Sequence, residues 1–342
     1  MEPTADLDRQ PPVSIVMPTL DERSAIRDCV DSLLAQDYPH ITEILVVDGG
    51  STDGTRELAA EMDPRVRVVD NPGVTAAAAM NVGLAAAAND MIVRVDSHTI
   101  YLPDYVSASV DALLESGADW VGGPMRPVGL NSFGRAVAAV TTSRLGIGNG
   151  RFHYATTATD VETVYLGTFD RRIVTAVGGY DDRDLQWAAE DQELAYRLRR
   201  SGRRIRIDPR IRSWYFPRQT PRALWRQYFN YGMCKASTLR KHRTLPYWRP
   251  LVPVALVVGC VGGVGASMVT GRRRWALTPI GTYATAVAAG SLAAGTDPGV
   301  APHRAAAAFG ICHWAYGLGF LNGVGRIVTG RPFDSRPRRS RW

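Results

Sequence analysis

The chain has few cysteines, and none of them forms a metal-binding or redox pair. Cys29, Cys234, Cys260 and Cys312 are far apart in 342 residues, and no CxxC sequence occurs. This spacing argues against both a structural zinc site and a disulfide framework, and it favours a reducing compartment. A secretory signal is also missing from residues 1–12, which are polar. We therefore expect a flexible N-terminus at 1–12 and a front domain that stays in the cytosol.

No recognisable nucleic-acid module accompanies the net charge of +7. The basic residues concentrate in the second half of the chain beside long apolar stretches, so anionic lipid is the expected partner and nucleic acid is not. Residues 326–342 contain six arginines and one acidic residue, Asp334. A basic tail at 327–342 suits phospholipid headgroups at roughly 1 kcal/mol per basic residue. The alternative is a solvated, disordered tail.

Apolar runs alternate with helical periodicities in the first part of the chain. Strands are predicted at 13–17, 43–47, 66–69 and 91–95, and helices at 26–34, 74–88 and 104–116. After Trp120 we expect a strand, a helix at 133–144, a loop region to 163, a helix at 189–201 ended by Gly202, and a final strand. The near-continuous apolar strands predict an α/β fold, a Rossmann-like and mostly parallel sheet with helices on both faces.

Three carboxylates stand where predicted strands end: Asp21, Asp48 and Asp96. Because ligands of open α/β sheets bind outside the carboxyl ends of the strands, we expect these side chains to converge on one crevice. Such an acidic set suits a cation-bearing or polyol ligand. A nucleotide-sugar with its metal ion fits this description.

The sequence Asp96-Ser97-His98 follows one of these strands directly. In an extended chain alternate residues share a face, so Asp96 and His98 point the same way while Ser97 turns aside. A carboxylate and an imidazole together can ligate one divalent cation, with manganese favoured and magnesium also suitable. The structural alternative is a strand-end aspartate that only caps a turn.

The glycine-rich segment 48–55, DGGSTDGT, lies between a strand and a helix. Its glycines let the backbone approach a ligand closely, and Asp48 can accept hydrogen bonds from a base or ribose. No Gly-Lys-Ser/Thr follows, so this is not a Walker loop. A plain tight connection between strand and helix remains the alternative.

The second half of the chain has the composition of a membrane-attached region. Residues 219–246 place aromatic and basic residues on one broad face, which predicts an interfacial helix, with an ordinary docked amphipathic helix as the alternative. Residues 251–270 carry no charge over a length that can cross a hydrocarbon core of roughly 30 Å. Two weaker apolar segments follow within 247–326. We predict a hydrophobic membrane region of up to three helices, with the number of spans left open because the basic loops conflict with the positive-inside rule.

Four motifs in order make the chain recognisable: PTLDE at 18–22, DGGSTDGT at 48–55, RVDSH at 94–98 and ED at 190–191. Together they resemble family 2 inverting glycosyltransferases of the GT-A fold over roughly residues 13–240. A closer resemblance, to membrane-associated glycosyltransferases of the succinoglycan-biosynthesis type, rests on VRVDSHTIYLPDYV, EDQELAYRLRRSG, FPRQTPRALWRQYFNYG and HWAYGLGFLNG. It implies a GT-A catalytic domain at 13–218.

The resemblance also implies roles for single residues. It places Asp21 and Asp48 near the base and ribose, Asp96 with His98 at the metal and diphosphate, and Asp191 as general base, with Glu190 supporting it or contacting the acceptor. The implied nucleotide-sugar site comprises Pro18, Asp21, Glu22, Asp48, Gly49, Ser51, Asp53, Asn81, Gly83, Arg94 and Asp96. For Glu190 and Asp191 the plain alternative is that acids in a helix's first turn are favoured by the helix dipole in any protein.

Three arginines, Arg218, Arg222 and Arg226, are expected to meet the diphosphate or an anionic lipid carrier, because guanidinium groups suit phosphate. Their alternative is a solvated basic face. The Q-x-x-R-W signature of processive polysaccharide synthases is absent, and RQYFNYG stands in the corresponding region. The addition of a single sugar is therefore expected over polymerisation.

These features predict an inverting enzyme at the cell membrane, with its catalytic domain on the cytoplasmic face. It would move one sugar from a nucleotide diphosphate donor, a UDP-sugar, to a lipid-linked saccharide with the help of Mn²⁺ or Mg²⁺. Two alternatives remain: a polyprenyl-phosphate sugar synthase, which needs no general base, and a non-catalytic nucleotide-sugar-binding membrane protein.

Overall fold

The computed structural model describes residues 10–148, 150–183, 189–244 and 248–331. These residues divide into two compact units: unit 1 holds 10–126 and 151–215, and unit 2 holds 127–150 and 216–331. Most of the predicted N-terminal segment 1–12 lies outside the described residues, and so does the predicted basic tail beyond Arg331.

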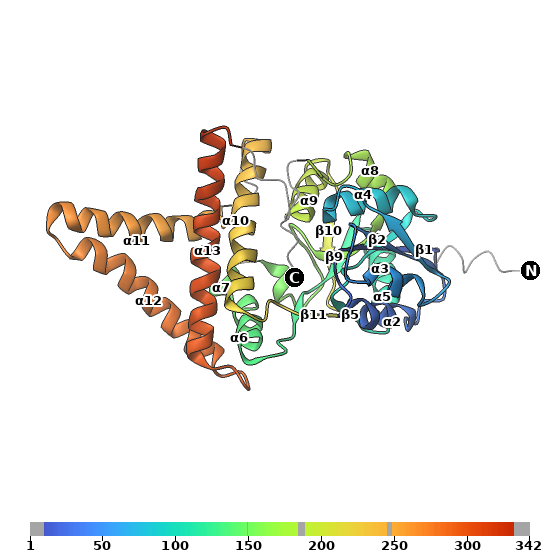
Figure 1. Ribbon diagram of the computed structural model, residues 1–342, viewed down its shortest axis with the longest axis horizontal. Coiled ribbons are helices and arrows are strands. Elements are labelled where there is room, and N and C mark those ends of the chain that lie inside the picture. The colour runs from blue at the N-terminus through green and yellow to red at the C-terminus, as the bar shows by residue number, and fades with distance from the viewer. Residues whose placement is uncertain (1–9, 149, 184–188, 245–247, 332–342) are drawn as a thin grey trace, which may run out of the picture. The chain divides into compact units, whose positions relative to one another are not determined.

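An eight-stranded mixed sheet forms the centre of unit 1, in the order β3-β2-β1-β4-β9-β6-β10-β8 (Figure 1). Four parallel strands make up one side: β3 (Val66–Asp70), β2 (Ile41–Asp48), β1 (Val13–Thr19) and β4 (Met91–Arg94). The other side consists of β9 (Tyr165–Asp170), β6 (Trp120–Gly123), β10 (Ile205–Ile207) and β8 (Thr159–Asp160). The four strands predicted before residue 100 are confirmed.

Strand β9 lies in the middle of the sheet, and the sequence did not predict it. It runs antiparallel to both of its neighbours, β4 and β6, and so makes the sheet mixed. Its second and third residues, Leu166 and Gly167, have φ angles of 56° and 124° in the left-handed region. This distorted backbone breaks the alternation of side chains that would mark a strand in the sequence. The Leu166 carbonyl instead accepts a hydrogen bond from Trp120 Nε1 at 3.1 Å.

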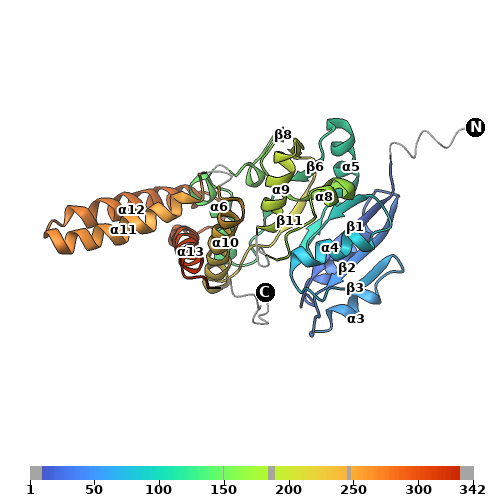
Figure 2. The same ribbon diagram turned by 90° about the horizontal axis from the view of Figure 1, so that it is seen from above.

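Helices cover both faces of the sheet, as predicted (Figure 2). Ile15 and Met17 pack on one face with α2 (Ile26–Leu34) and α5 (Tyr105–Ser116). Val16, between them, packs on the opposite face with α4 (Ala76–Ala86) and α9 (Glu190–Arg200). The opposite sides reflect the two-residue period of a strand. Further helices of unit 1 are α3 (Thr55–Ala60), α8 (Arg171–Ala176) and the 3₁₀ turn Arg151–His153.

A small second sheet continues the chain beyond β4. It contains β5 (Thr99–Tyr101), β11 (Ser213–Tyr215) and β7 (Arg126–Pro127). Strand β5 begins directly after His98, so residues 95–98 form a short bend between two strands that belong to different sheets.

Unit 2 is helical, and its core lies where α6 (Ser132–Thr141), α10 (Pro221–His242) and α13 (Pro302–Val328) meet. The short helix α7 (Arg144–Ile147) follows α6. Helices α10 and α13 pack closely through glycines: a Cβ on Gly232 would lie 2.1 Å from the Tyr316 carbonyl oxygen, and one on Gly319 would lie 2.1 Å from that of Phe229. Leu224 of α10 is fully buried in this core, whereas Trp225 and Tyr231 are 40% and 39% exposed. The interfacial role of this helix stays a prediction.

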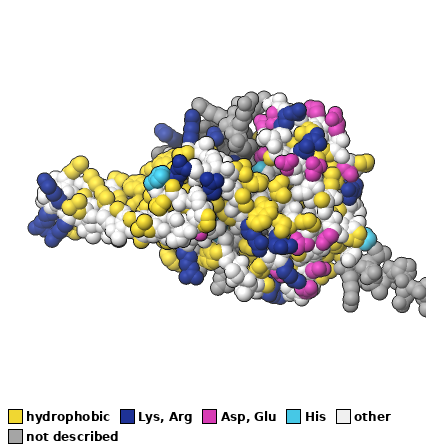
Figure 3. All heavy atoms as spheres, turned by 90° about the horizontal axis from the view of Figure 1, so that it is seen from below, with side chains coloured by type: hydrophobic (Ala, Val, Ile, Leu, Met, Phe, Trp, Pro, Cys, Tyr) yellow, Lys and Arg dark blue, Asp and Glu magenta, His cyan; other side chains and the backbone are white. Residues whose placement is uncertain are grey.

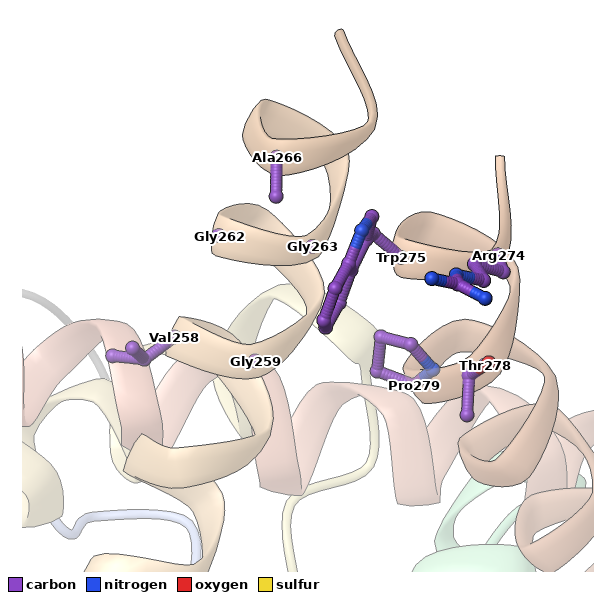
Figure 4. A pocket seen from close by; sticks show the side chains of 9 residues that line it. All are labelled: Val258, Gly259, Gly262, Gly263, Ala266, Arg274, Trp275, Thr278 and Pro279. Carbon is purple, nitrogen blue, oxygen red and sulfur yellow. The ribbon is translucent and has the colours of Figure 1, made fainter. Parts of the chain in front are cut away.

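Helices α11 (Leu251–Thr270) and α12 (Arg274–Ala294) form a hairpin within unit 2. Among the described residues, α11 alone is long and apolar enough to cross a membrane, which by itself is weak evidence for a span. Figure 3 shows apolar side chains along the hairpin and basic ones at its end, where Arg272, Arg273 and Arg274 are exposed. Near that end the two helices border a hollow of about 470 Å³, with the glycines of α11 facing Trp275 and Pro279 of α12 (Figure 4).

Candidate active site

The loops after β1 and β2 are joined by three consecutive backbone amides. The N–H groups of Asp21, Glu22 and Arg23 donate to Ser51 Oγ at 2.8 Å, Thr55 Oγ1 at 2.9 Å and Asp53 Oδ2 at 3.0 Å, respectively. In return Asp21 Oδ1 accepts from the backbone N–H of Thr52 at 2.8 Å. The motifs at 18–22 and 48–55 are therefore one hydrogen-bonded structure.

Asp48 organises the glycine-rich loop that follows it. Its side chain is buried, with the whole residue 2% exposed, and it accepts from the backbone N–H groups of Gly50 and Ser51, both at 3.0 Å, and from Ser51 Oγ. Arg56 Nη1 lies 3.7 Å from Asp48 Oδ2. Gly49 is required by space, since a Cβ there would lie 2.8 Å from the carbonyl oxygen of Val74. The contacts of Asp48 that the structure shows are those of a loop-forming group.

Asp96 and His98 stand at the end of β4, close to the end of β1. Both are partly exposed, and Ser97 between them is buried with its hydroxyl 3.4 Å from the Pro18 carbonyl oxygen. Residues 97 and 98 form a turn and not a strand, so the extended chain that the sequence analysis assumed here is wrong, although exposure still alternates over 96–98. His98 Nδ1 lies 3.1 Å from Glu22 Oε1. This contact brings together a metal ligand and a nucleotide-site residue of the sequence prediction.

The donor chemistry at this point fits a divalent cation that shares its coordination with a substrate. A carboxylate oxygen of Asp96 and the Nε2 of His98 are suitable ligands, and a carboxylate on the other ring nitrogen, as Glu22 provides, is the usual partner of a metal-binding histidine. Within the described ranges no group of three or more His, Cys, Asp or Glu residues is placed to hold a metal ion by itself. A cation here would therefore need oxygens from a ligand such as a diphosphate.

Arg94 connects the end of β4 to the start of α9. It is 6% exposed, and its Nη2 donates to Glu190 Oε1 at 2.9 Å. Burial by itself would lower the pKa of Arg94, yet nearby groups raise this pKa well above its ordinary value; these groups are Tyr180, Glu190, Asp96 and Asp191. The predicted metal ligand and the predicted base, 95 positions apart, thus act on the same buried cation.

Asp191 lies in the first turn of α9 together with Glu190. It is partly exposed, and its Oδ1 accepts from the backbone N–H of Gln192 at 2.7 Å. The helix ends as predicted, with arginines in its last turn and Gly202 at a φ of 83° just beyond it. Ala189, before the helix, has a φ of 66°, which is unusual for a residue with a Cβ.

Asn81 and Gly83 make packing contacts in the structure. The Asn81 amide donates to the Tyr180 carbonyl at 2.9 Å, and its oxygen accepts from the Tyr180 N–H at 2.8 Å, so it fixes the backbone of a distant segment. Gly83 lets α4 approach β1, since a Cβ there would lie 2.3 Å from Val16 Cγ1. Their predicted place beside the nucleotide stays a prediction.

Two buried tyrosines and one partly buried tyrosine lie near Asp96, and the sequence prediction did not include them. The Asp96 N–H donates to the Tyr101 hydroxyl at 2.7 Å, and the Tyr165 hydroxyl lies 3.0 Å from Thr99 Oγ1. Burial, reinforced by the nearby Asp96 carboxylate, raises the pKa of Tyr101 and of Tyr165 well above the ordinary value. Tyr105 packs edge-on against Tyr101. Only the aromatic content of 99–105 could have indicated Tyr101 and Tyr105, and no local pattern indicated Tyr165.

The three predicted phosphate-binding arginines belong to unit 2. Arg218 is partly buried before α10, while Arg222 and Arg226 are exposed on its first turns. The contacts that unite the other site residues lie within unit 1, and the role of these arginines stays a prediction.

Comparison with known proteins gives consistent results in sequence. The family model described as glycosyl transferase family 2 matches residues 14–169. The succinoglycan biosynthesis protein ExoA of Rhizobium meliloti is 34% identical over 314 residues, which cover 90% of this chain and 93% of that protein. The dolichyl N-acetyl-alpha-D-glucosaminyl phosphate 3-beta-D-2,3-diacetamido-2,3-dideoxy-beta-D-glucuronosyltransferase of Methanococcus voltae is 25% identical over 240 residues, or 67% of this chain and 74% of that one.

Solved structures share the fold. The mannosyltransferase PcManGT of Pyrobaculum calidifontis, in complex with GDP-Man and Mn²⁺, has a TM-score of 0.55 at 18% identity and covers 94% of this chain and 88% of that one. TarS of S. aureus in complex with UDP-GlcNAc has a TM-score of 0.50 at 14% identity, covering 94% and 93%. At such identities the likeness concerns the fold alone, a GT-A-like mixed α/β sheet with helices.

Proposed function

The chain belongs to glycosyl transferase family 2, and on that premise we propose that it is an inverting enzyme that adds one sugar to a lipid-linked saccharide. The donor is a nucleotide diphosphate sugar, a UDP-sugar in the first instance. The observation that carries this proposal is the 2.9 Å contact between Arg94 and Glu190, which joins the end of β4, near Asp96, to the first turn of α9, with Asp191; an in-line transfer needs a base close to the place of the leaving group.

The chemistry assigned to the chain's own residues is a displacement with inversion. Asp191 takes the proton of the acceptor hydroxyl while that oxygen forms a bond to the anomeric carbon. The bond between the anomeric carbon and the diphosphate breaks, and its electron pair leaves with the diphosphate. Asp21 and Asp48 hold the nucleoside side of the donor. A divalent cation bound by Asp96 and His98 would neutralise charge on the departing diphosphate.

Two kinds of observation support the proposed acceptor and the proposed location. ExoA is named for succinoglycan biosynthesis and the Methanococcus protein for a dolichyl-linked sugar phosphate, which favours a lipid-linked acceptor in polysaccharide or glycoconjugate synthesis. Helix α11 is twenty residues long, about 30 Å, and exposes apolar side chains such as Val258, Val261 and Met268. We assign the enzyme to the cell membrane with unit 1 on the cytoplasmic face.

The test is nucleotide release by the full chain in lipid nanodiscs, with a panel of UDP- and GDP-sugars and with lipid-linked saccharides as acceptors. We expect acceptor-dependent release from one donor, loss of this activity with a chelator, and recovery with Mn²⁺ or Mg²⁺. Equal turnover with the chelator present would contradict the cation assignment. Turnover on polyprenyl phosphate alone would identify a polyprenyl-phosphate sugar synthase, and donor binding without any release would identify a non-catalytic binding protein.

A further inference from the structure

Arg94 has buried hydrogen-bonding atoms that are left without partners. Its Nη2 pairs with Glu190, but Nε and Nη1 have no acceptor among the described residues, although both are inaccessible to solvent. The ring centre of Tyr180 lies 5.4 Å from the guanidinium carbon, and the solvent-inaccessible hydroxyl of Tyr180 makes no hydrogen bond of good geometry within the described part of the chain. Such groups cost stability, so this cluster is better explained by what it positions than by what it stabilises.

The two members of the ion pair are close in sequence to the predicted metal ligand and to the predicted general base. Arg94 is the last residue of β4 and precedes Asp96 by two positions. Glu190 is the first residue of α9 and immediately precedes Asp191. One contact of 2.9 Å therefore joins the strand end with the predicted metal ligand to the helix turn with the predicted base.

We propose that the Arg94–Glu190 pair is a positioning device that sets the place of Asp191 relative to the sugar's leaving group, and that neither residue touches the donor or the acceptor. The proposal rests on the proposed function and deepens it. It changes two sequence-based expectations, because Arg94 was expected in the nucleotide-sugar site and Glu190 as a possible acceptor contact.

The burial of the pair argues for this assignment. Glu190 is 8% exposed and its Oε1 is committed to Arg94, so little of its carboxylate is available for an acceptor. The charges of an ion pair buried to this extent have little mobility, and removal of either partner leaves the other uncompensated. The planar guanidinium bonds to Glu190 through one N–H group and lies over the Tyr180 ring, which gives it an orientation that a lysine ammonium would not have.

A second buried ion pair on the same helix offers a matched control. Glu193 and Arg197 lie one turn further along α9 and contact each other at 2.7 Å. Arg197 also donates to the carbonyl oxygens of Val177 and Gly179, both at 2.6 Å. The chemistry is the same, but the hydrogen bonds of Arg197 lead to the turn after α8 and not to β4.

The experiment compares Arg94→Met, Arg94→Lys, Glu190→Gln and Glu190→Asp with Glu193→Gln, each in the full chain in nanodiscs. For each variant kcat, the donor Kd measured calorimetrically without acceptor, and the melting temperature are determined. We expect Arg94→Met and Glu190→Gln to lower kcat by about 100-fold while the donor Kd changes by less than about threefold. Arg94→Lys should recover part of the rate, because it keeps the charge and loses the planar guanidinium.

Glu190→Asp distinguishes an effect on the position of Asp191 from an effect on the stability of the protein. It keeps the negative charge but shortens the side chain by one methylene. It should lose rate with a nearly unchanged melting temperature, whereas Glu193→Gln should lower the melting temperature and leave kcat within about twofold of wild type. A donor Kd that weakens in parallel with kcat would overturn the proposal, and so would full kcat in the folded Glu190 variants. A wild-type chain that releases no nucleotide would instead refute the proposed function, before any variant is compared.

Discussion

The two sides of the candidate site differ in how completely their polar groups are satisfied. On the donor side, formed by the loops 18–23 and 48–55, the carboxylates of Asp21, Asp48 and Asp53 accept hydrogen bonds from backbone amides of these same loops. On the transfer side, formed by Arg94, Asp96, Glu190 and Asp191, the described residues leave two nitrogens of Arg94 unpaired. The donor-side carboxylates therefore stabilise the backbone of their own loops, whereas the transfer side contains buried polar atoms whose missing hydrogen bonds reduce stability.

This difference predicts different consequences of mutation. A donor-side carboxylate supports backbone structure, so its loss should weaken both the fold and donor binding. Asp191, by contrast, is partly exposed, so its loss should appear mainly in the rate. Variants on the two sides should therefore differ, and we expect the largest effect at Asp191.

Asp191→Asn should cause the largest loss. The amide cannot take a proton from the acceptor, and general bases contribute about 10²- to 10⁴-fold in rate. We expect kcat to fall within that range, with the donor Kd and the melting temperature close to wild type. The measurement is nucleotide release under saturating donor and acceptor, with calorimetric donor binding in parallel.

Asp48→Asn is the comparison variant from the donor side. An asparagine can keep its oxygen towards the N–H groups of Gly50 and Ser51, but it loses the charge that strengthens these hydrogen bonds, and its N–H₂ replaces the oxygen that accepts from Ser51 Oγ; we expect a cost of about 1–3 kcal/mol. We expect a lower melting temperature and a weaker donor Kd. If Asp48→Asn kept the wild-type melting temperature and donor Kd and lost only kcat, the proposed difference between the donor side and the transfer side would be wrong.

The donor side was largely predictable from the sequence, because its carboxylates mark the points where apolar strands end. Asp48 is the last residue of β2, and Asp21 and Asp96 each follow their strands by two residues. In a parallel arrangement these ends meet at one edge, and the structure places β1 between β2 and β4. Local hydrophobicity and chain direction are enough for that inference.

The transfer side could not be assembled in the same way. Arg94 and Glu190 are separated by 96 positions, and their pairing depends on strands β6 and β9, which lie between them in the chain. Strand β9 runs antiparallel to β4 and β6, and its sequence lacks the two-residue period of a regular strand. No local pattern could therefore specify its register with these neighbours. For the same reason Tyr180 and Tyr165 were not recognised as neighbours of the site.

Ala189→Gly should give a smaller effect of the opposite sign. Ala189 has a φ of 66°, and this left-handed conformation costs a residue with a Cβ roughly 1–2 kcal/mol. Glycine removes this cost, but part of the gain is lost because glycine increases the conformational entropy of the unfolded chain. We expect a net stabilisation of about 0.5–1 kcal/mol in thermal unfolding, with kcat retained.

Ala195→Gly supplies the matched control for Ala189. Ala195 is fully buried within α9, where glycine should destabilise by at least about 1 kcal/mol. If Ala189→Gly instead lowered kcat without a change in stability, the strained backbone itself would have to be counted among the groups that position Asp191.

The smallest effect concerns Asp53 and the pH dependence of the donor side. Burial by itself would raise the pKa of Asp53, but hydrogen bonds from Thr55 and from the Arg23 N–H outweigh it and lower this pKa below the ordinary 3.8. A carboxyl whose pKa is lowered on folding stabilises the protein above its unfolded pKa, and this contribution is lost as the pH falls through the folded value.

Asp53→Asn should therefore differ most from wild type in melting temperature between pH 5 and 7, and the difference should shrink as the pH falls below about 4. Asp63→Asn is the control, because the pKa of Asp63 is also lowered, by Arg65, outside the two donor-side loops. Both variants should show the same pH trend, and Asp53→Asn alone should weaken donor binding. If the difference in melting temperature between Asp53→Asn and wild type stayed constant or grew below pH 4, the hydrogen bonds of Asp53 to residues 23 and 55 would not depend on its charge. The stability of the donor side would then come from packing around Gly49.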